Sequence, residues 1–308
     1  MDEGGRGSGG GLEEGTHPSG QPQGSKRCRA VGGAVDTGPV GGLHLHFLGH
    51  STVRVESAGH TVLTDPLLTG RVGPLRRVVP APAPETYAGV DLVLISHLHG
   101  DHLHLPSLRL LGPDVRVVVP RGAGAWLRAR GFRHVVEVLP GETIPHGALR
   151  VTAVPADHSG HRWGPRLTHG PTTESVGHLV EGAGSTVYAS GDTDLFDGMR
   201  LLGARGVDVT LLPVWGWGPT LGPGHLDPER AAEAVARVRP RFAVPVHWGT
   251  LAMAGTRLRG PLGARMRRLL EEPPRHFADA VARRGLATRV LVTEPGNRVA
   301  IDSPAGMA

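Results

Sequence analysis

The amino-acid sequence predicts an α/β fold in which two β-sheets pack together and helices cover their outer faces. Three observations carry this prediction. Short apolar runs bounded by Gly, Pro and His follow one another between Leu43 and Leu63, as in strands joined by tight turns. The run 91–95 is apolar after its first residue, which is typical of a strand buried on both faces. Farther along, strand-like and helix-like segments alternate.

Each element follows from its own pattern. The strands are expected at 43–48, 52–56, 60–63, 91–95, 115–119, 149–154, 175–180, 186–189, 207–212, 242–246 and 289–292. Helices are expected at 122–130, 195–204, 227–238 and 257–271. The third helix has the clearest beginning, with Asp227 as N-cap, Pro228 in the first position and Glu229 in the first turn. The segment 71–84 mixes Arg with Pro, and a solvated loop is favoured there over a phosphate-binding or membrane-surface loop.

Composition limits the class of protein. Residues 1–42 are rich in Gly and lack periodic apolar residues, so we expect a disordered tail before one domain at 43–303. All but one of the 33 basic residues are Arg, but they are scattered, so no nucleic-acid partner is expected. The single Cys28 excludes an intrachain disulfide, and metal ligands must therefore be nitrogen or oxygen. Without a signal sequence or a transmembrane segment, a cytoplasmic location is expected.

A dense group of metal-ligand residues follows the buried strand that ends at Ile95. His97 and His99 alternate to the same side of an extended segment, and Asp101 and His102 come after the chain turns at Gly100. Burying these side chains without a metal would leave several polar groups unpaired. The segment therefore predicts two metal sites.

Further ligand residues follow other apolar strands. The strand 151–154 leads to His158, the strand 186–189 leads to Asp192, and the strand 242–246 leads to His247. They supply a third histidine for each metal and a carboxylate that can bridge two ions. His161 is a rival to His158, which is preferred because it follows its strand more directly.

The pattern His97-x-His99-x-Asp101-His102, followed by distant His, Asp and His residues, resembles the metallo-β-lactamase superfamily over residues 44–250. Within it, the chain is most similar to the branch that contains N-acyl phosphatidylethanolamine phospholipase D and ascorbate-6-phosphate lactonase. The similar segments are 49–52, 64–66, 95–106, 190–193, 225–229 and 246–250.

This resemblance implies a four-layer αββα sandwich of two mixed sheets, with the site at one edge. It implies that His97, His99 and His158 hold one metal, that Asp101, His102 and His247 hold a second, and that Asp192 bridges them. Imidazole and carboxylate ligands suit zinc, with manganese or iron as alternatives.

The chemistry expected of this site is hydrolysis by a metal-activated hydroxide. Asp101 is expected to orient the attacking water, and His225 to contact the scissile group or to protonate the leaving group, unless it is a loop histidine bound to backbone. His50 and Asp65 are expected to orient ligands. Trp215 and Trp217 are expected to form an apolar wall for a small-molecule or lipid-like substrate, or else to anchor their loop.

The sequence does not decide the substrate. The preferred hypothesis is a phosphodiester, and the alternative is a lactone or carboxylic ester, because the same site polarises a phosphoryl or a carbonyl oxygen. A nuclease and an inactive metal-binding protein are less favoured. Gly100, Asp194 and Leu195 stand where phospholipase-like members tend to have aromatic residues. The sequence does not decide whether the chain forms a homo-oligomer.

Overall fold

The structure is a computed structural model that describes residues 42–162, 170–254 and 260–301. The expected tail falls almost wholly outside these residues, and so does the first part of the expected helix 257–271. The limits of the tail and of the domain therefore remain predictions.

The first sheet has the strand order β17-β1-β2-β3-β6-β7-β8. Its strands are β1 (Leu43–Gly49), β2 (Thr52–Ser57), β3 (His60–Thr64), β6 (Leu92–Leu94), β7 (Arg116–Pro120), β8 (Val135–Val138) and β17 (Arg298–Ile301). The strands β3, β6, β7 and β8 run parallel, and the pairs β17·β1, β1·β2 and β2·β3 are antiparallel. This sheet is therefore mixed.

The second sheet is mixed as well, with the order β16-β14-β13-β12-β11-β10-β9. Its strands are β9 (Thr143–His146), β10 (Leu149–Pro155), β11 (Val176–Gly182), β12 (Ser185–Ala189), β13 (Val209–Pro213), β14 (Phe242–Val246) and β16 (Arg289–Val290). The strands β12, β13, β14 and β16 run parallel, and the pairs β9·β10, β10·β11 and β11·β12 are antiparallel.

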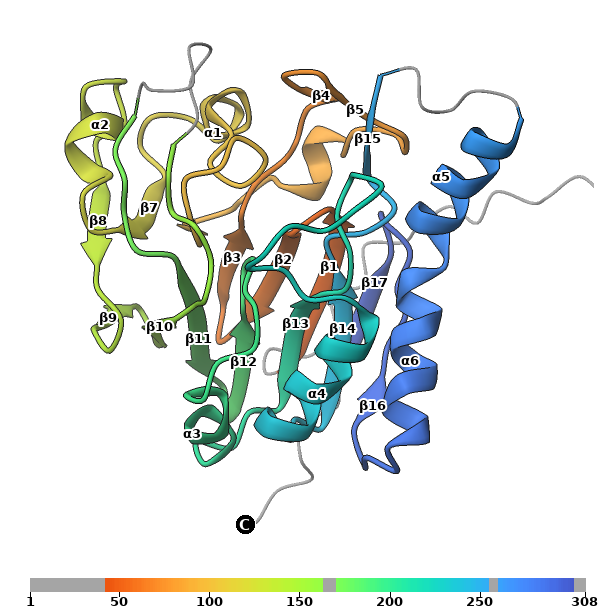
Figure 1. Cartoon of the computed structure of the whole chain (residues 1–308). Helices are drawn as coiled ribbons and strands as arrows, with labels where there is room; N and C mark the ends of the chain where they lie inside the picture. Colours follow the sequence, from red (N-terminus) through yellow and green to blue (C-terminus); the bar gives the residue numbers. More distant parts are fainter. Residues whose placement is uncertain (1–41, 163–169, 255–259, 302–308) are drawn as a thin grey trace, which may run out of the picture. The chain divides into compact units, whose positions relative to one another are not determined.

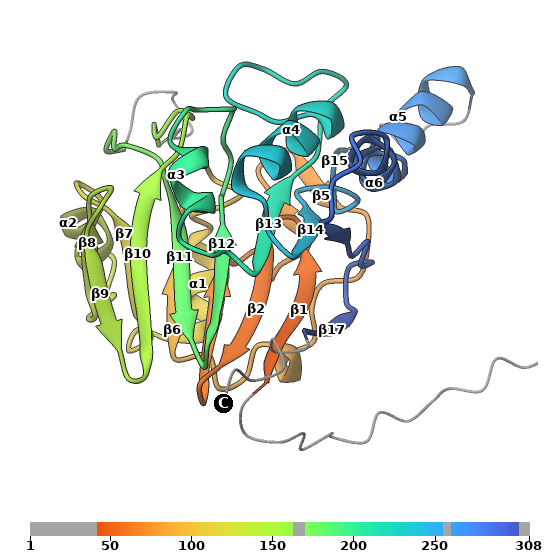
Figure 2. The ribbon, with the colours of Figure 1, turned by 90° about the horizontal axis from the view of Figure 1, so that it is seen from below.

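Helices cover both outer faces. They are α1 (Leu105–Leu111), α2 (Gly124–Arg128), α3 (Met199–Gly203), α4 (Pro228–Val238), α5 (Pro261–Glu271) and α6 (Pro273–Arg283), together with the short 3-10 helix η1 (Pro84–Thr86). Figure 1 shows α3, α4 and α6 in front of the second sheet, with the strands of the first sheet behind it. Figure 2 shows the same layers from below.

The side-chain alternation of β6 explains the layering. Leu92 and Leu94 join the core between the sheets, whereas Val93 and Ile95 pack with Leu108 of α1 on the outer face. Because successive residues of a strand point to opposite faces, an apolar run is needed to fill both layers. The expected αββα sandwich and the expected buried strand are thereby confirmed.

Several expected elements are shorter or were missed. The helix expected at 195–204 is reduced to α3, whereas α4 begins as predicted, with the Asp227 side chain accepting a hydrogen bond from the Arg230 N–H at 2.8 Å. Neither α1 nor α6 was predicted from the sequence.

The expectation of a solvated loop at 71–84 is right only in part, because residues 78–83 belong to no strand or helix and are exposed or half-buried, whereas the first half of the segment forms strands. Two strands, β4 (Arg71–Val72) and β5 (Leu75–Arg77), pair with β15 (Leu251–Met253) in a small third sheet. Arg77 lies mostly buried there, and burial lowers the pKa of its guanidinium to about 10. It donates hydrogen bonds to the carbonyls of Leu48 and Leu67. The sequence of this segment did not indicate strands, because β5 is stabilised by pairing with β15, which lies far away in the sequence.

Candidate metal centre

The candidate site lies where strands of both sheets end. The strands β1, β3 and β6 run in one direction, as do β10, β12, β13 and β14, so the loops after each set open at a common edge. These loops carry all the residues that the sequence assigned to the metals. Residues far apart in the sequence therefore meet at one place.

Three histidine rings converge in the first group. The Nδ1 atom of His99 lies 3.0 Å from Nε2 of His97 and 3.1 Å from Nε2 of His158. Ligand nitrogens around a tetrahedral zinc ion are separated by about 3.3 Å, given Zn–N bonds of about 2.0–2.1 Å. The spacing of these three nitrogens is close to that of a metal triad.

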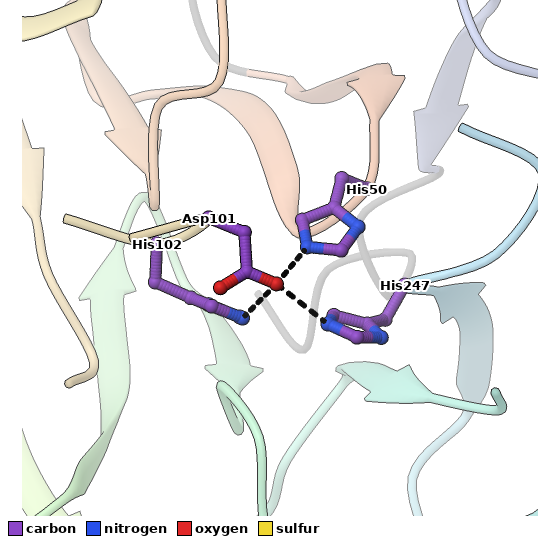
Figure 3. Close-up of side chains that lie close together, drawn as sticks. All are labelled: His50, Asp101, His102 and His247. Carbon is purple, nitrogen blue, oxygen red and sulfur yellow. Dashed lines mark hydrogen bonds and ion pairs between the residues drawn. The ribbon is translucent and has the colours of Figure 1, made fainter. Parts of the chain in front are cut away.

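The second group joins Asp101, His102 and His247, with His50 beside them (Figure 3). The Oδ2 atom of Asp101 lies 4.0 Å from Nε2 of His102 and 3.9 Å from Nε2 of His247. The rings of His102 and His247 are stacked, with their centroids 5.3 Å apart. The ligand atoms of all four residues lie within 4.8 Å of one another.

Asp192 lies next to both groups. Its Oδ2 atom is 3.3 Å from Nε2 of His102 and 3.3 Å from Nε2 of His247. It also forms one compact ligand set with His97 and His102, and another with His158 and His225. This position is the one that a bridging carboxylate requires.

The outer nitrogens of four ligand histidines all face acceptors. Nδ1 of His102 donates to Oδ2 of Asp65 at 2.9 Å. Nδ1 of His158 donates to the Gly224 carbonyl at 2.7 Å, and Nδ1 of His247 donates to the Trp215 carbonyl at 2.7 Å. These bonds put the single proton of each neutral ring on the outer nitrogen, so the inner nitrogen keeps its lone pair for a metal.

His97 follows the same logic through Ser96. The Ser96 hydroxyl donates to Oδ2 of Asp65 at 2.6 Å, so its oxygen accepts from Nδ1 of His97 at 3.0 Å. The inner nitrogens of His102 and His247, with Oδ1 of Asp192 and Nε2 of His99, are buried and make no hydrogen bond within the described residues. Buried polar atoms are normally paired, and a metal ion would satisfy most of these. The residues present fit a metal.

The electrostatics favour cations at this point. Burial alone would raise the pKa of Asp192, but the nearby His247 and His102 hold it well below its usual value. Burial likewise opposes ionisation of Asp101, and His102 and His50 hold its pKa well below the usual range. Both carboxylates are therefore ionised at neutral pH, ready to bind a divalent ion.

Burial keeps most of the ligand histidines neutral. It lowers the pKa of His247 to about 3 and that of His99 to about 4, and it lowers the pKa of His97 well below the usual value. In His102 burial acts in the same direction, but Asp192 and Asp65 outweigh it and raise the pKa, so without a metal this ring holds a second proton, on Nε2, which a metal ion would displace. A deprotonated imidazole is the form that binds metals.

Backbone strain is concentrated at the site. His50, Asp65 and His247 have φ angles of 57°, 35° and 62°, in the left-handed region that residues other than Gly rarely adopt. The His50 carbonyl accepts a hydrogen bond from the His247 N–H at 2.7 Å, which links the two strained turns. Such strain persists where the surrounding structure compensates for it, often at functional sites.

The structure places the supporting residues as follows. Nε2 of His50 lies 3.0 Å from Oδ2 of Asp101, and Asp65 binds both Ser96 and His102. His225 is half-buried, with Nδ1 at 3.2 Å from two loop carbonyls and Nε2 at 3.5 Å from Oδ2 of Asp192. The ring therefore binds the loop backbone and also faces Asp192, and its catalytic role stays a prediction.

The remaining predicted residues lie at the margin. Trp215 is half-buried and bonds through Nε1 to the Gly218 carbonyl at 3.2 Å, while Trp217 is 38% exposed. His161 is bound to Oγ1 of Thr172 at 2.8 Å and belongs to none of the ligand sets among the described residues. Asp194, one of the departures from the phospholipase-like pattern, pairs with Arg230.

Some supporting groups could not be inferred from the sequence. Ser96 carries a weak signal, as a small polar residue between a buried strand and the first ligand. The carbonyls of Gly224 and Trp215 carry none, because every residue has a carbonyl.

Comparison with known proteins agrees with this geometry. Residues 60–248 match the family model described as the β-lactamase superfamily domain. The chain is also 32% identical over 264 residues to a metal-dependent hydrolase of Methanopyrus kandleri, across 82% of this chain and 98% of that protein. The chain belongs to the metallo-β-lactamase superfamily. The family predicted from the sequence is thereby confirmed.

Other superfamily members show the same relationship. A solved metallo hydrolase from Ignicoccus hospitalis is 26% identical, with a TM-score of 0.64, over 84% of this chain and 98% of that chain. An N-acyl-phosphatidylethanolamine-hydrolyzing phospholipase D of Caenorhabditis elegans is 29% identical over 70% of this chain and 66% of that protein. The similarity thus reaches the branch that the sequence motifs indicated.

Proposed function

We propose that the protein is a hydrolase with two divalent metal ions, acting on a phosphodiester of a small-molecule or lipid-like substrate. The observation that carries the proposal is the orientation of four of the five ligand histidines, His97, His102, His158 and His247, whose outer nitrogens bind acceptors while their inner nitrogens face the other ligands. Such an arrangement prepares lone pairs for cations before any cation arrives.

Seven residues would hold the metals. His97, His99 and His158 form one site, Asp101, His102 and His247 form the other, and Asp192 serves both. Zinc fits the nitrogen and oxygen donors best, and manganese or iron would suit them too. Two such ions lower the pKa of water towards neutrality and stabilise charge on the attacked group.

The side chains of the chain itself supply orientation and proton transfer. Asp101, held by His50 at 3.0 Å, is the carboxylate that we assign to orienting the attacking water. His225 faces the site through Nε2, so a proton carried there is placed for transfer to a leaving group. The exposed ring of Trp217 offers an apolar surface at the margin of the site.

The similarity to the phospholipase D supports a phosphodiester. A lactone or carboxylic ester is the second candidate, because one site can polarise either kind of oxygen. Among the described residues no helix is long and apolar enough to cross a membrane. The cytoplasmic location and any self-association stay predictions.

The test is metal analysis of the purified protein, followed by assays with bis-aryl phosphodiester, lactone, thioester and β-lactam substrates. We expect two metals per chain and turnover of the phosphodiester. Less than one metal per chain would contradict the metal centre. Turnover of the lactone without turnover of the phosphodiester would replace the first substrate class with the second.

A further inference from the structure

A small cavity lies between the sheets beside the metal centre. It is lined by the ends of β3, β6 and β12 and by the middle of β11, and its volume is about 10 Å³. A space of this size accommodates about one water molecule, provided that two or more polar groups face it. The chemistry of the lining therefore decides whether water belongs there.

Two buried polar side chains that line the cavity have unpaired atoms. Nε2 of His178 and Oγ of Ser51 make no hydrogen bond to any part of the chain that the structure describes. The two residues are only 2% and 6% exposed. His178 belongs to the second sheet, and Ser51 follows the first strand of the first sheet. The cavity is lined by both residues, and neither unpaired atom finds a hydrogen-bond partner in its own sheet.

The third polar group is the carboxylate of Asp65. It accepts bonds from the Ser96 N–H, from the Ser96 hydroxyl and from Nδ1 of His102. An ionised carboxylate offers about four acceptor positions, so about one remains. Asp65 also lines the cavity.

The residues next to His178 in the sheet are small and leave room for its ring. Its partners in register are Ala153 on β10 and Ala189 on β12, both small residues. An apolar residue would satisfy the core at this position without a polar partner. The presence of an imidazole there is explained if Nε2 has a bonding partner in the cavity.

We propose that the cavity binds one water molecule, and that His178 is a positioning residue that acts through this water on Asp65 and, through Asp65, on His102. The water accepts bonds from His178 and Ser51 and donates to the free position of Asp65. The inference rests on the proposed metal centre, because its effect is to fix the orientation of a metal ligand.

The first test is a high-resolution crystal structure of the protein as purified. We expect one ordered water within hydrogen-bonding distance of His178 Nε2 and of Asp65. Its absence would overturn the proposal, whatever metal the protein holds.

The second test is zinc affinity, measured by competition with a chelator. We expect His178→Leu to weaken the affinity by about 10-fold or more, since groups that support metal ligands commonly contribute 10- to 100-fold. His178→Gln should recover much of the loss, because its amide can also bond to the water. Ser51→Ala provides a milder variant in case His178→Leu does not fold.

Thr210→Val is the matched control, because Thr210 is a buried hydroxyl residue on β13 that does not line the cavity. It should bind zinc like the wild type. Wild-type affinity in both His178→Leu and Ser51→Ala would refute the positioning role. A wild-type protein that binds no zinc contradicts the proposed function instead, and the crystallographic water then tests the cavity alone.

Discussion

Two clusters of histidine and aspartate side chains lie at opposite ends of the sheets, and in both the polar atoms of neighbouring side chains are within hydrogen-bonding distance of one another. In the metal centre the nearest ring nitrogens are 3.0 Å apart. In the second cluster, His60, Asp91 and His146, Nδ1 of His60 is 3.0 Å from Oδ2 of Asp91 and Nε2 of His146 is 3.2 Å from Oδ1. We call this the Asp91 cluster. By residue type and spacing alone, either group could hold a metal ion.

The outer nitrogens distinguish the two clusters. In the Asp91 cluster they face donors: the Ala148 N–H lies 3.4 Å from Nε2 of His60, and the Arg116 guanidinium lies 3.3 Å from Nδ1 of His146. Each ring proton is therefore on the inner nitrogen, where it bonds to Asp91. In the metal centre the outer nitrogens of four of the five ligand histidines face acceptors, so their inner nitrogens can present lone pairs to a metal.

We infer from this difference that the hydrogen bonds around the rings determine which of the two clusters binds a metal. The Asp91 cluster is a hydrogen-bonded clamp between β9 of one sheet and the start of β3 and β6 in the other. A metal ion in the Asp91 cluster would replace the protons on the inner ring nitrogens. Those protons would have to move to the outer nitrogens, which already face the hydrogen-bond donors Ala148 N–H and Arg116. The guanidinium charge of Arg116 would oppose it further.

The largest effect is expected for Asp192→Ala. Loss of the carboxylate that serves both metal sites should reduce turnover by about 1000-fold or more and lower the metal content, because a bridging ligand acts on both ions. The fold should survive, as judged by circular dichroism. Asp91→Ala is the control and should leave the rate and the metal content unchanged. An active Asp192→Ala enzyme would remove Asp192 from the bridging role.

A smaller effect is expected when an acceptor is turned into a donor. In Asp65→Asn the amide can present N–H groups to His102, which favours the wrong ring tautomer, so metal affinity should fall by about 10- to 100-fold. Chelator competition measures the change. Asp91→Asn provides the comparison, with no expected change in affinity. Equal affinities in wild type and Asp65→Asn would break the argument from hydrogen-bond direction.

His178, which belongs to neither cluster, predicts a dependence of stability on pH. Burial lowers its pKa in the folded protein to about 4, from an ordinary value of 6.5. As the pH falls, His178 therefore takes up a proton in the unfolded chain before it does so in the folded protein. The free energy of unfolding that the neutral ring contributes above pH 6.5 is lost between pH 6.5 and 4. From pH 6.5 to 5 this contribution amounts to about 2 kcal/mol.

Urea unfolding, after a chelator has removed any bound metal, measures this contribution as the difference between the wild type and His178→Gln. The free energy of unfolding of the wild type should fall more steeply between pH 6.5 and 5 than that of His178→Gln, which has no ring to titrate. Parallel slopes would mean that His178 takes up its proton equally well in the folded state.

The smallest effect is expected in the clamp itself. His146→Ala removes one hydrogen bond to Asp91, and the free energy of unfolding should fall by about 1 kcal/mol while the metal content stays the same. Urea titration and metal analysis provide the two readouts. His134→Ala, at a histidine that is 62% exposed, is the control and should change neither. A loss of bound metal in His146→Ala would show that the clamp is a metal site.

The sequence predicted which residues meet at the candidate metal centre, because they come directly after apolar strands; their role as ligands stays a prediction. His97, Asp192 and His247 each follow a strand whose pattern is plain, and parallel strands bring such residues to one edge. The helix α4 was equally clear, since Asp227 and Pro228 mark its start.

Other features depend on contacts between distant segments. The helix α6 was missed because Pro273 and Pro274 read as a break, although proline is well tolerated in a first helical turn. The strands β4 and β5 have two and three residues, too few for a periodic pattern. The acceptors of the metal centre include backbone carbonyls, whose direction only the fold determines. The Asp91 cluster was not predicted from the sequence, because only the fold brings His60, Asp91 and His146 together.

Anomalous diffraction from crystals soaked in zinc tests the central claim most directly. We expect two peaks within the set of seven ligands, on either side of Asp192, and none between His60 and His146. A peak at the Asp91 cluster, or a metal centre without zinc, would contradict the account that hydrogen-bond direction selects the metal site.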